Sequence, residues 1–150
     1  MSFFFKGKEV EAVLFSPLEG KLTYQGKPAA NAKIKLWIAW KDKEGETESY
    51  YADDQGHFTI PQITATYRDN PLAQLIIKQR LTVFFEGKEI DIWAFSKKEE
   101  AIHTELGGRP VNLSCEMTNE EVTVRGNRSL GGTRCTWETL DPMENMDENS

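Results

Sequence analysis

Alternating apolar residues between positions 20 and 60 restrict the fold of this chain more than any other feature. In a β-strand every second side chain lies on the same face. Five apolar residues stand at alternate positions here: Ala32, Ile34, Leu36, Ile38 and Trp40. Turn residues flank this run, with Gly-Lys-Pro at 26–28 and Asp-Asp-Gln-Gly at 53–56. The sequence therefore predicts antiparallel strands whose even-numbered side chains face a core.

The segment that follows this run is predicted to close a first hairpin. If residues 42–45 form a four-residue turn, Trp37 lies opposite Tyr50 on the solvent face of the sheet. Tryptophan and tyrosine are enriched at the energetic centres of protein interfaces. Trp37 and Tyr50 are therefore candidate partner-binding residues.

A second hairpin is predicted around Glu86-Gly87, because glycine adopts the positive φ that tight turns require. The flanking strands span residues 79–85 and 88–94. Their pairing places Arg80 opposite Trp93 on the solvent face, where a guanidinium over an indole ring forms a cation–π contact. Arg80 and Trp93 thus join the candidate partner-binding residues.

Residues 97–106 are predicted to form the one short helix of an otherwise all-β chain. A capping-box pattern begins at Ser96, two apolar residues four positions apart share a face, and Gly107-Gly108 ends the run. A single helical turn is also predicted at 70–74, where an asparagine precedes a proline. The remaining apolar alternation beyond residue 110 is typical of further strands.

Acidic charge is concentrated near the C-terminus. The chain has 18 lysines and arginines against 24 acidic residues, for a net charge of −6. Five acidic residues lie beyond position 137, so residues 1–137 carry only −1. The sequence predicts one β-sandwich domain over 1–137 and an acidic, flexible tail over 138–150. Glu144, Asp147 and Glu148 of this tail are candidate partner-binding residues, and no nucleic-acid partner is expected without a basic face.

The N-terminal segment predicts that the protein stays in the cytoplasm. Three consecutive apolar residues, Phe3 to Phe5, precede charged ones, whereas a secretory signal needs about 7–15 and a membrane span about 20. No membrane partner is expected. In a reducing compartment Cys115 and Cys135 are expected to be buried, reduced thiols on neighbouring strands, with a disulfide as the alternative.

The titratable residues favour structural roles over catalysis. His57 follows two aspartates and a glycine, a pattern that predicts a turn with His57 in water and not a metal or proton site. His103 is expected at the surface of the predicted helix. The sequence holds no nucleophile elbow, phosphate-binding glycine loop or dinucleotide fingerprint. We therefore expect no enzyme activity, and no catalytic, cofactor or metal site.

The strand and turn spacing over residues 18–61 resembles the carboxypeptidase regulatory-like, or transthyretin-like, domain. This resemblance implies a small antiparallel sandwich that serves as a binding or accessory module. Transthyretin-like folds include a hydroxyisourate hydrolase group with a Tyr-Arg-Gly-Ser signature, and the nearest segment here, Arg125-Gly126-Asn127, lacks its tyrosine and serine. Motifs at 87–93, 107–116 and 134–137 also resemble a group of small, uncharacterised bacterial cytosolic proteins built on the same module.

These features together predict a non-enzymatic protein-binding module. The second resemblance implies an immunity-type protein that neutralises a toxin of a bacterial secretion system, of type VI in its most concrete form. A basic toxin suits the acidic tail through electrostatic attraction. One alternative is an accessory or carrier module of a secretion apparatus. The other is a carbohydrate-binding sandwich in which Trp37, Tyr50 and Trp93 form a stacking platform.

Overall fold

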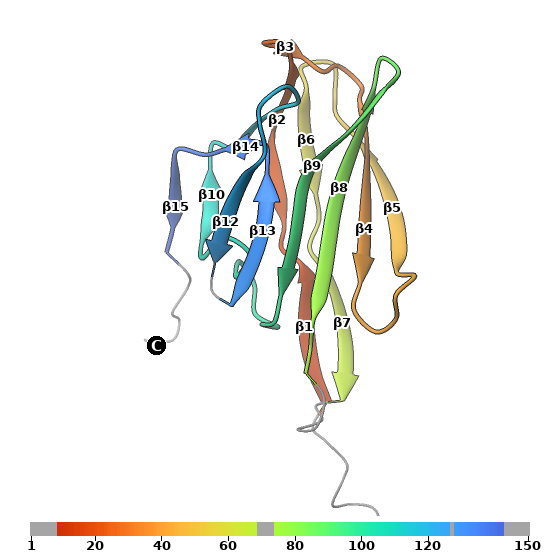
Figure 1. Cartoon of the computed structure of the whole chain (residues 1–150), viewed down its shortest axis with the longest axis vertical. Coiled ribbons are helices and arrows are strands. Elements are labelled where there is room, and N and C mark those ends of the chain that lie inside the picture. The colour runs from red at the N-terminus through yellow and green to blue at the C-terminus, as the bar shows by residue number, and fades with distance from the viewer. Residues whose placement is uncertain (1–8, 69–73, 127, 143–150) are drawn as a thin grey trace, which may run out of the picture.

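The computed structural model describes residues 9–68, 74–126 and 128–142, and these residues form strands, turns and loops. The strands build two layers that pack face to face (Figure 1). The all-β sandwich predicted from the sequence is thereby confirmed. Within the same residues the structure contains no helix with the length and apolar character to cross a membrane.

One layer is an antiparallel six-stranded sheet with the order β12-β13-β9-β8-β4-β5. In that order its strands span Val122–Gly126, Ser129–Thr133, Lys88–Lys97, Ile77–Phe85, Lys33–Ala39 and Glu46–Tyr51. The central strands β4, β8 and β9 supply most of its buried side chains. The strands β12 and β5 form its two edges.

The facing layer is built around β2 (Leu18–Tyr24), which pairs with β6 (His57–Ile60) and with β11 (Ser114–Glu116). The β2–β11 pair is parallel, whereas the β2–β6 pair is antiparallel. The short strand β14 (Cys135–Thr136) adds to β11, and β3 (Lys27–Pro28) adds to β2. This layer therefore joins the N-terminal and C-terminal parts of the chain.

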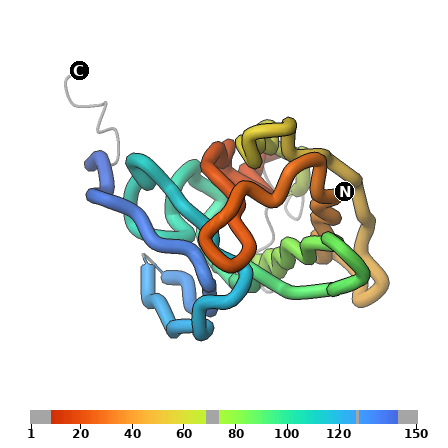
Figure 2. The backbone as a smooth tube through the Cα atoms, turned by 90° about the horizontal axis from the view of Figure 1, so that it is seen from above, coloured from red at the N-terminus to blue at the C-terminus, as the bar shows by residue number. Residues whose placement is uncertain are grey.

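Two further pairs complete the fold. The strands β1 (Glu9–Phe15) and β7 (Ile63–Arg68) continue the β2–β6 ladder in a register that places Pro17 opposite Pro61. Because proline has no backbone N–H to donate, the ladder is interrupted at this point. The strands β10 (Arg109–Val111) and β15 (Thr139–Asp141) pair on one side of the molecule, and Figure 2 shows that the C-terminal strands gather on this side, away from β4 and β5.

Apolar side chains from both layers meet in one core. The even-numbered residues from Ala32 to Ile38 are buried, which confirms the predicted orientation of this strand, and Trp40 is half-buried. Trp93 also lies in the core, with its ring centroid 4.6 Å from that of Phe95. Trp93 is only 2% exposed, so its predicted place on the solvent face is wrong.

The predicted register of the first hairpin is also wrong. Trp37 pairs with Thr47 and not with Tyr50, whose partner is Ile34. The turn is longer than predicted, because β4 ends at Ala39 and β5 begins at Glu46. This shift by an odd number of residues moves Tyr50 to the core-facing side of the sheet, so the expected pair of exposed rings does not form.

The second hairpin confirms the predicted turn at Glu86-Gly87 and the pairing of Val83 with Ile90. A β-bulge between Leu81 and Thr82 then changes the register. Beyond the bulge Leu81 lies opposite Trp93, and Arg80 lies opposite Ala94. The predicted Arg80–Trp93 contact is therefore wrong, and the Arg80 guanidinium instead stacks over Trp37, 4.9 Å from its ring centroid.

The helix predicted over residues 97–106 is absent, because β9 extends to Lys97 and turns follow. His103 has a φ of 62°, a left-handed conformation that ends any right-handed helix. Lys97 and Glu105 point into the interior and form a buried ion pair, with 3.6 Å between Nζ and Oε2. These long-range contacts stabilise a non-helical conformation and so override the helix that the capping-box pattern predicts.

The two cysteines form a disulfide. The prediction of reduced thiols is therefore wrong, and the alternative of a disulfide is correct. Cys115 on β11 lies directly opposite Cys135 on the antiparallel strand β14, and both residues are buried, as predicted. Neighbouring strands with this register bring the two sulfur atoms within bonding reach. Because disulfides persist mainly in oxidising compartments, cytoplasmic localisation stays a prediction.

The boundary expected at residue 137 also changes. Residues 139–141 form β15, and the Glu138 N–H donates to the carbonyl of Val111 at 2.9 Å, so the first residues of the predicted tail belong to the sandwich. The rest of the predicted acidic tail, with Glu144, Asp147 and Glu148, lies outside the described residues. Most of the turn predicted at 70–74 lies outside them as well.

Candidate partner-binding site

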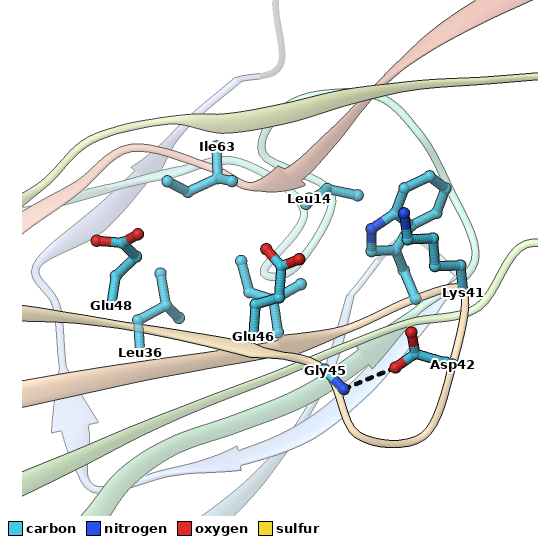
Figure 3. Close-up of a pocket in the computed structure, with 10 residues that line it drawn as sticks. Leu14, Leu36, Lys41, Asp42, Gly45, Glu46, Glu48 and Ile63 are labelled. Carbon is cyan, nitrogen blue, oxygen red and sulfur yellow. Dashed lines mark hydrogen bonds between the residues drawn. The ribbon is translucent and has the colours of Figure 1, made fainter.

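A groove opens between the two layers where β4 and β5 face β1 and β7 (Figure 3). Its floor is apolar and is formed by Leu14, Leu36, Ile38, Trp40 and Ile63. Its rim is charged and is formed by Lys41, Asp42, Glu46 and Glu48. We call the groove that these residues line the acidic groove, and its volume is about 150 Å³.

The acidic side of the groove comes from the edge strand β5. Glu46 pairs with Ile38 and Glu48 pairs with Leu36, so both glutamates stand on the core-facing side of the sheet. Both are nevertheless exposed, whereas Leu36 is only 1% exposed. Figure 3 shows both carboxylates extending from β5 toward the side of Leu14 and Ile63. The charges therefore stand over an apolar floor in which Leu14, Leu36 and Ile38 are buried, and Trp40 and Ile63 are half-buried.

A fixed turn sets the position of Glu46. Gly45 has a φ of 69°, and a Cβ at this position would come within 2.4 Å of the Ile38 carbonyl oxygen. The Gly45 N–H donates to Asp42 Oδ1 at 2.8 Å, and Trp37 Nε1 donates to the carbonyl oxygen of Glu44 at 2.9 Å. Only glycine fits this conformation and this space, so the turn holds the acidic residues of the rim in a defined place.

The groove has a negative rim with one compensating cation. Three carboxylates, those of Asp42, Glu46 and Glu48, stand against the ammonium group of Lys41, which lies 5.7 Å from the centroid of the Trp40 ring. Burial, and next the neighbouring Glu48 carboxylate, raises the pKa of Tyr50. The local field therefore favours a cation over an anion.

The size of the groove restricts its ligand. Pockets for drug-sized molecules enclose roughly 300–1,000 Å³, which is well above the volume of about 150 Å³ found here. A single long side chain fits this space better than a complete small-molecule ligand. Lysine and arginine match both parts of the groove, because they lay an apolar stem along apolar surface and keep a charged end in water.

The residues predicted to bind a partner do not form one surface. Trp37 and Arg80 lie together on the outward face of the six-stranded sheet. Tyr50 lies on the opposite, core-facing side next to the acidic groove, and Trp93 is in the core. The three rings proposed as a sugar-stacking platform are thus on different sides of the sheet.

The two histidines differ in their surroundings. His57 is exposed, and its backbone N–H donates to Asp53 Oδ1 at 2.9 Å, which confirms the predicted turn with His57 in water. Hydrogen bonds from the N–H groups of His57 and Gln55 lower the pKa of Asp53. His103 is half-buried and not a surface residue, and burial lowers its pKa. The described residues contain no group of three potential metal ligands.

Sequence reasoning missed a buried polar network beside the β1–β2 junction. Glu105 accepts hydrogen bonds from Ser16 Oγ at 2.7 Å and from Gln79 Nε2 at 2.7 Å. Gln79 Oε1 in turn accepts from Trp93 Nε1 at 3.0 Å. Burial lowers the pKa of Lys97, whose Nζ also donates to Thr104 and to a backbone carbonyl. Each polar group has a partner, so the network serves the fold.

A second carboxylate, that of Glu116, fastens the β2–β3 turn. Its oxygens accept hydrogen bonds from Thr23 Oγ1 at 2.7 Å and from the backbone N–H groups of Gln25 and Gly26 at 2.8 and 2.9 Å. Thr118 Oγ1 donates a further bond at 2.6 Å. Burial alone would raise the pKa of Glu116, but these donors outweigh it and lower the pKa to about 2.

Replacing Glu116 by glutamine is expected to lower the free energy of unfolding by about 2 kcal/mol at pH 7, a value that allows for partial solvent screening. The folded pKa lies below the ordinary value of 4.5. The stabilisation is therefore complete above pH 4.5 and is lost as pH falls toward 2. Urea denaturation of the wild-type protein and of the Glu116→Gln variant at pH 7 and pH 3 measures the difference in unfolding free energy. A difference that is as large at pH 3 as at pH 7 would contradict this prediction.

The fold and the groove define an all-β sandwich with an acidic, partly apolar groove at one edge of its six-stranded sheet. The chain matches one family model over residues 18–120, and that family is described as a domain of unknown function, DUF6795. Because the match covers more than half of the chain, the protein belongs to this family. No curated protein and no solved structure matches the chain.

Proposed function

We propose that the protein is a non-enzymatic protein-binding module that holds a basic side chain of its partner in the acidic groove. The observation that carries this proposal is the position of Glu46 and Glu48, which stand exposed above the buried side chains of Leu36 and Ile38. Core-facing residues of a central strand are apolar, whereas an edge strand can carry charged residues at such positions. Carboxylates here offer charge to a partner.

The groove suits a cation that arrives from another protein. The ammonium or guanidinium group lies among three carboxylates, and its methylene stem covers Ile38 and Ile63. Desolvation by the apolar floor strengthens the ion pair compared with one in open water. The affinity should therefore depend on salt, while the covered apolar area lengthens the lifetime of the complex.

The most concrete form of this proposal is an immunity-type role in which the partner is a basic toxin of a bacterial secretion system. An accessory module of a secretion apparatus is the alternative. Coexpression with the partner in a heterologous host distinguishes the two. An immunity protein restores growth to cells that make the toxin, and a variant without the groove carboxylates restores it less. An accessory module leaves growth unchanged.

Replacing Glu46 and Glu48 together by glutamine is expected to weaken partner binding at least tenfold, because close ion pairs at interfaces contribute about 1.5 kcal/mol or more each. The partner is recovered from the native cell lysate on the wild-type protein, identified and purified. Calorimetric titration at low and at moderate salt then gives the Kd of each variant.

The matched control replaces Glu120 and Glu121 by glutamine. Both are exposed acidic residues next to β12, at the opposite edge of the same sheet. This control changes the net charge by the same amount and should alter the Kd less than twofold. Equal losses in the two double variants would mean that only net charge matters. Unchanged binding by the E46Q/E48Q variant would overturn the groove as the site.

A further inference from the structure

The strand β5 has a free edge beside the acidic groove. It pairs with β4 on one side and is the last strand of the six-stranded sheet, with no further strand along it among the described residues. All six of its residues are exposed or half-buried. An unpaired strand edge offers backbone N–H and C=O groups to another extended chain.

The register shows which groups of β5 point outward. The Ala52 N–H donates to the Ala32 carbonyl at 2.9 Å, and this pair continues the β4–β5 register. In an antiparallel pair, residues alternate between those bonded to the neighbouring strand and those whose backbone groups point away. Even-numbered residues of β5 therefore bond to β4. The backbone groups of Thr47, Ser49 and Tyr51 point to the free side.

We propose that the partner segment is an extended strand that adds antiparallel to β5, with basic residues at alternate positions opposite Glu46 and Glu48. This inference rests on the proposed function and identifies its partner. Every neighbouring pair in the six-stranded sheet is already antiparallel, so the added strand continues the existing pattern. Its backbone bonds supply affinity, and its alternate side chains supply specificity.

The alternation follows from the geometry of the ladder. Residues opposite Glu46 and Glu48 occupy the non-hydrogen-bonded pairs, in which facing Cα atoms are about 4.5 Å apart and side chains lie closest. Opposite charges at such positions stabilise the pair. Residues opposite Thr47 and Ser49 occupy the hydrogen-bonded pairs on the outward face. Threonine and other β-branched residues suit these places.

A second copy of this chain is a poor occupant of the same edge. An antiparallel β5 strand centred on Thr47 or on Glu48 would place a glutamate opposite another glutamate, and like charges in facing positions are destabilising. Inward-facing charges also protect edge strands from unspecific pairing. The two carboxylates thus reject copies of β5 and acidic strands while they accept a basic one, which is how charge gives an interface its specificity.

Synthetic peptides test this inference on the unmodified protein. The first peptide alternates lysine with threonine over nine residues. The second has the same composition with its lysines in one block. We expect the alternating peptide to bind at least tenfold more tightly by fluorescence anisotropy at low salt, and the E46Q/E48Q variant to remove this preference. Hydrogen exchange at the amides of Thr47 and Ser49 should slow in the complex.

N-methylated versions of the alternating peptide separate strand addition from simple charge attraction. Methyl groups on the threonine nitrogens remove the donors that face β5, and we expect at least a tenfold loss of affinity. Methyl groups on the lysine nitrogens lie on the far side and should cost less than threefold. Equal binding of both peptides, or no binding of the alternating peptide at millimolar concentration, would overturn strand addition. The proposed function is judged separately, by whether the native partner depends on Glu46 and Glu48.

Discussion

Replacing Glu105 by alanine is expected to lower the free energy of unfolding by about 3–5 kcal/mol, because it leaves a buried cation without its counter-ion. Lys97 is fully buried and Glu105 is 3% exposed. The substitution also removes the acceptor for Ser16 Oγ and Gln79 Nε2. A buried donor that loses its partner adds a further penalty to that of the charge.

Urea denaturation followed by tryptophan fluorescence measures this loss. A double variant that also replaces Lys97 by methionine should recover part of the stability, since it removes the unpaired charge and keeps the volume. The control is Glu99→Gln, which opens the more exposed ion pair with Arg128 and should cost less than about 1 kcal/mol. Similar losses for Glu105→Ala and Glu99→Gln would show that the buried network contributes little.

Removing the disulfide is expected to lower the free energy of unfolding by about 3 kcal/mol, through the greater entropy of an unfolded chain without the cross-link. The two cysteines are 20 positions apart, and the bond closes the segment that contains β12 and β13. Both sulfur atoms lie in the core, so Cys115 and Cys135 are replaced by alanine to avoid burying new polar groups.

Reduction of the wild-type protein by dithiothreitol gives an independent measurement of the same loss. The reduced protein and the double alanine variant should unfold at similar urea concentrations, both below that of the oxidised protein. A thiol assay under denaturing conditions establishes the oxidation state beforehand. Equal midpoints for oxidised and reduced protein would contradict a stabilising role for the bond.

The sequence predicts the β-sandwich well, because side-chain alternation depends on local residues. The period of two from Ala32 to Trp40 defines the core-facing side of β4 without knowledge of its neighbours. The turn at Glu86-Gly87 is also local. Register is different: the turn before Glu46 depends on the fit of Gly45 against the Ile38 carbonyl, which no local pattern reveals. The resemblance to carboxypeptidase regulatory-like domains stays a prediction.

The wrong predictions of the helix and of the position of Trp93 have one physical cause, which is that distant contacts override local sequence signals. The capping-box pattern at Ser96 is a genuine helix signal, yet burial of Lys97 and Glu105 as an ion pair replaces the helix. A bulge near Leu81 moves Trp93 into the core. A strand pattern cannot reveal such a bulge, because it arises from pairing between two strands.

The sequence gives only a weak indication of the acidic groove. Residues 46–51 follow a hairpin turn but lack alternate apolar residues, and such a strand is typical of a sheet edge. This signal predicts where a free edge lies. It does not predict that the carboxylates of Glu46 and Glu48 stand above an apolar floor, since that arrangement requires β1 and β7 from another layer.

The parallel pairing of β2 with β11 has a consequence for how the molecule assembles during synthesis. Thr23 and Glu116 meet across this pair although 93 positions separate them. One flank of β2 must therefore wait until most of the polypeptide has left the ribosome, and contacts between such distant positions slow folding. Until then the backbone groups on this side of β2 are unpaired, and unpaired strand edges make nascent chains prone to aggregation. We therefore expect molecular chaperones to act on this segment.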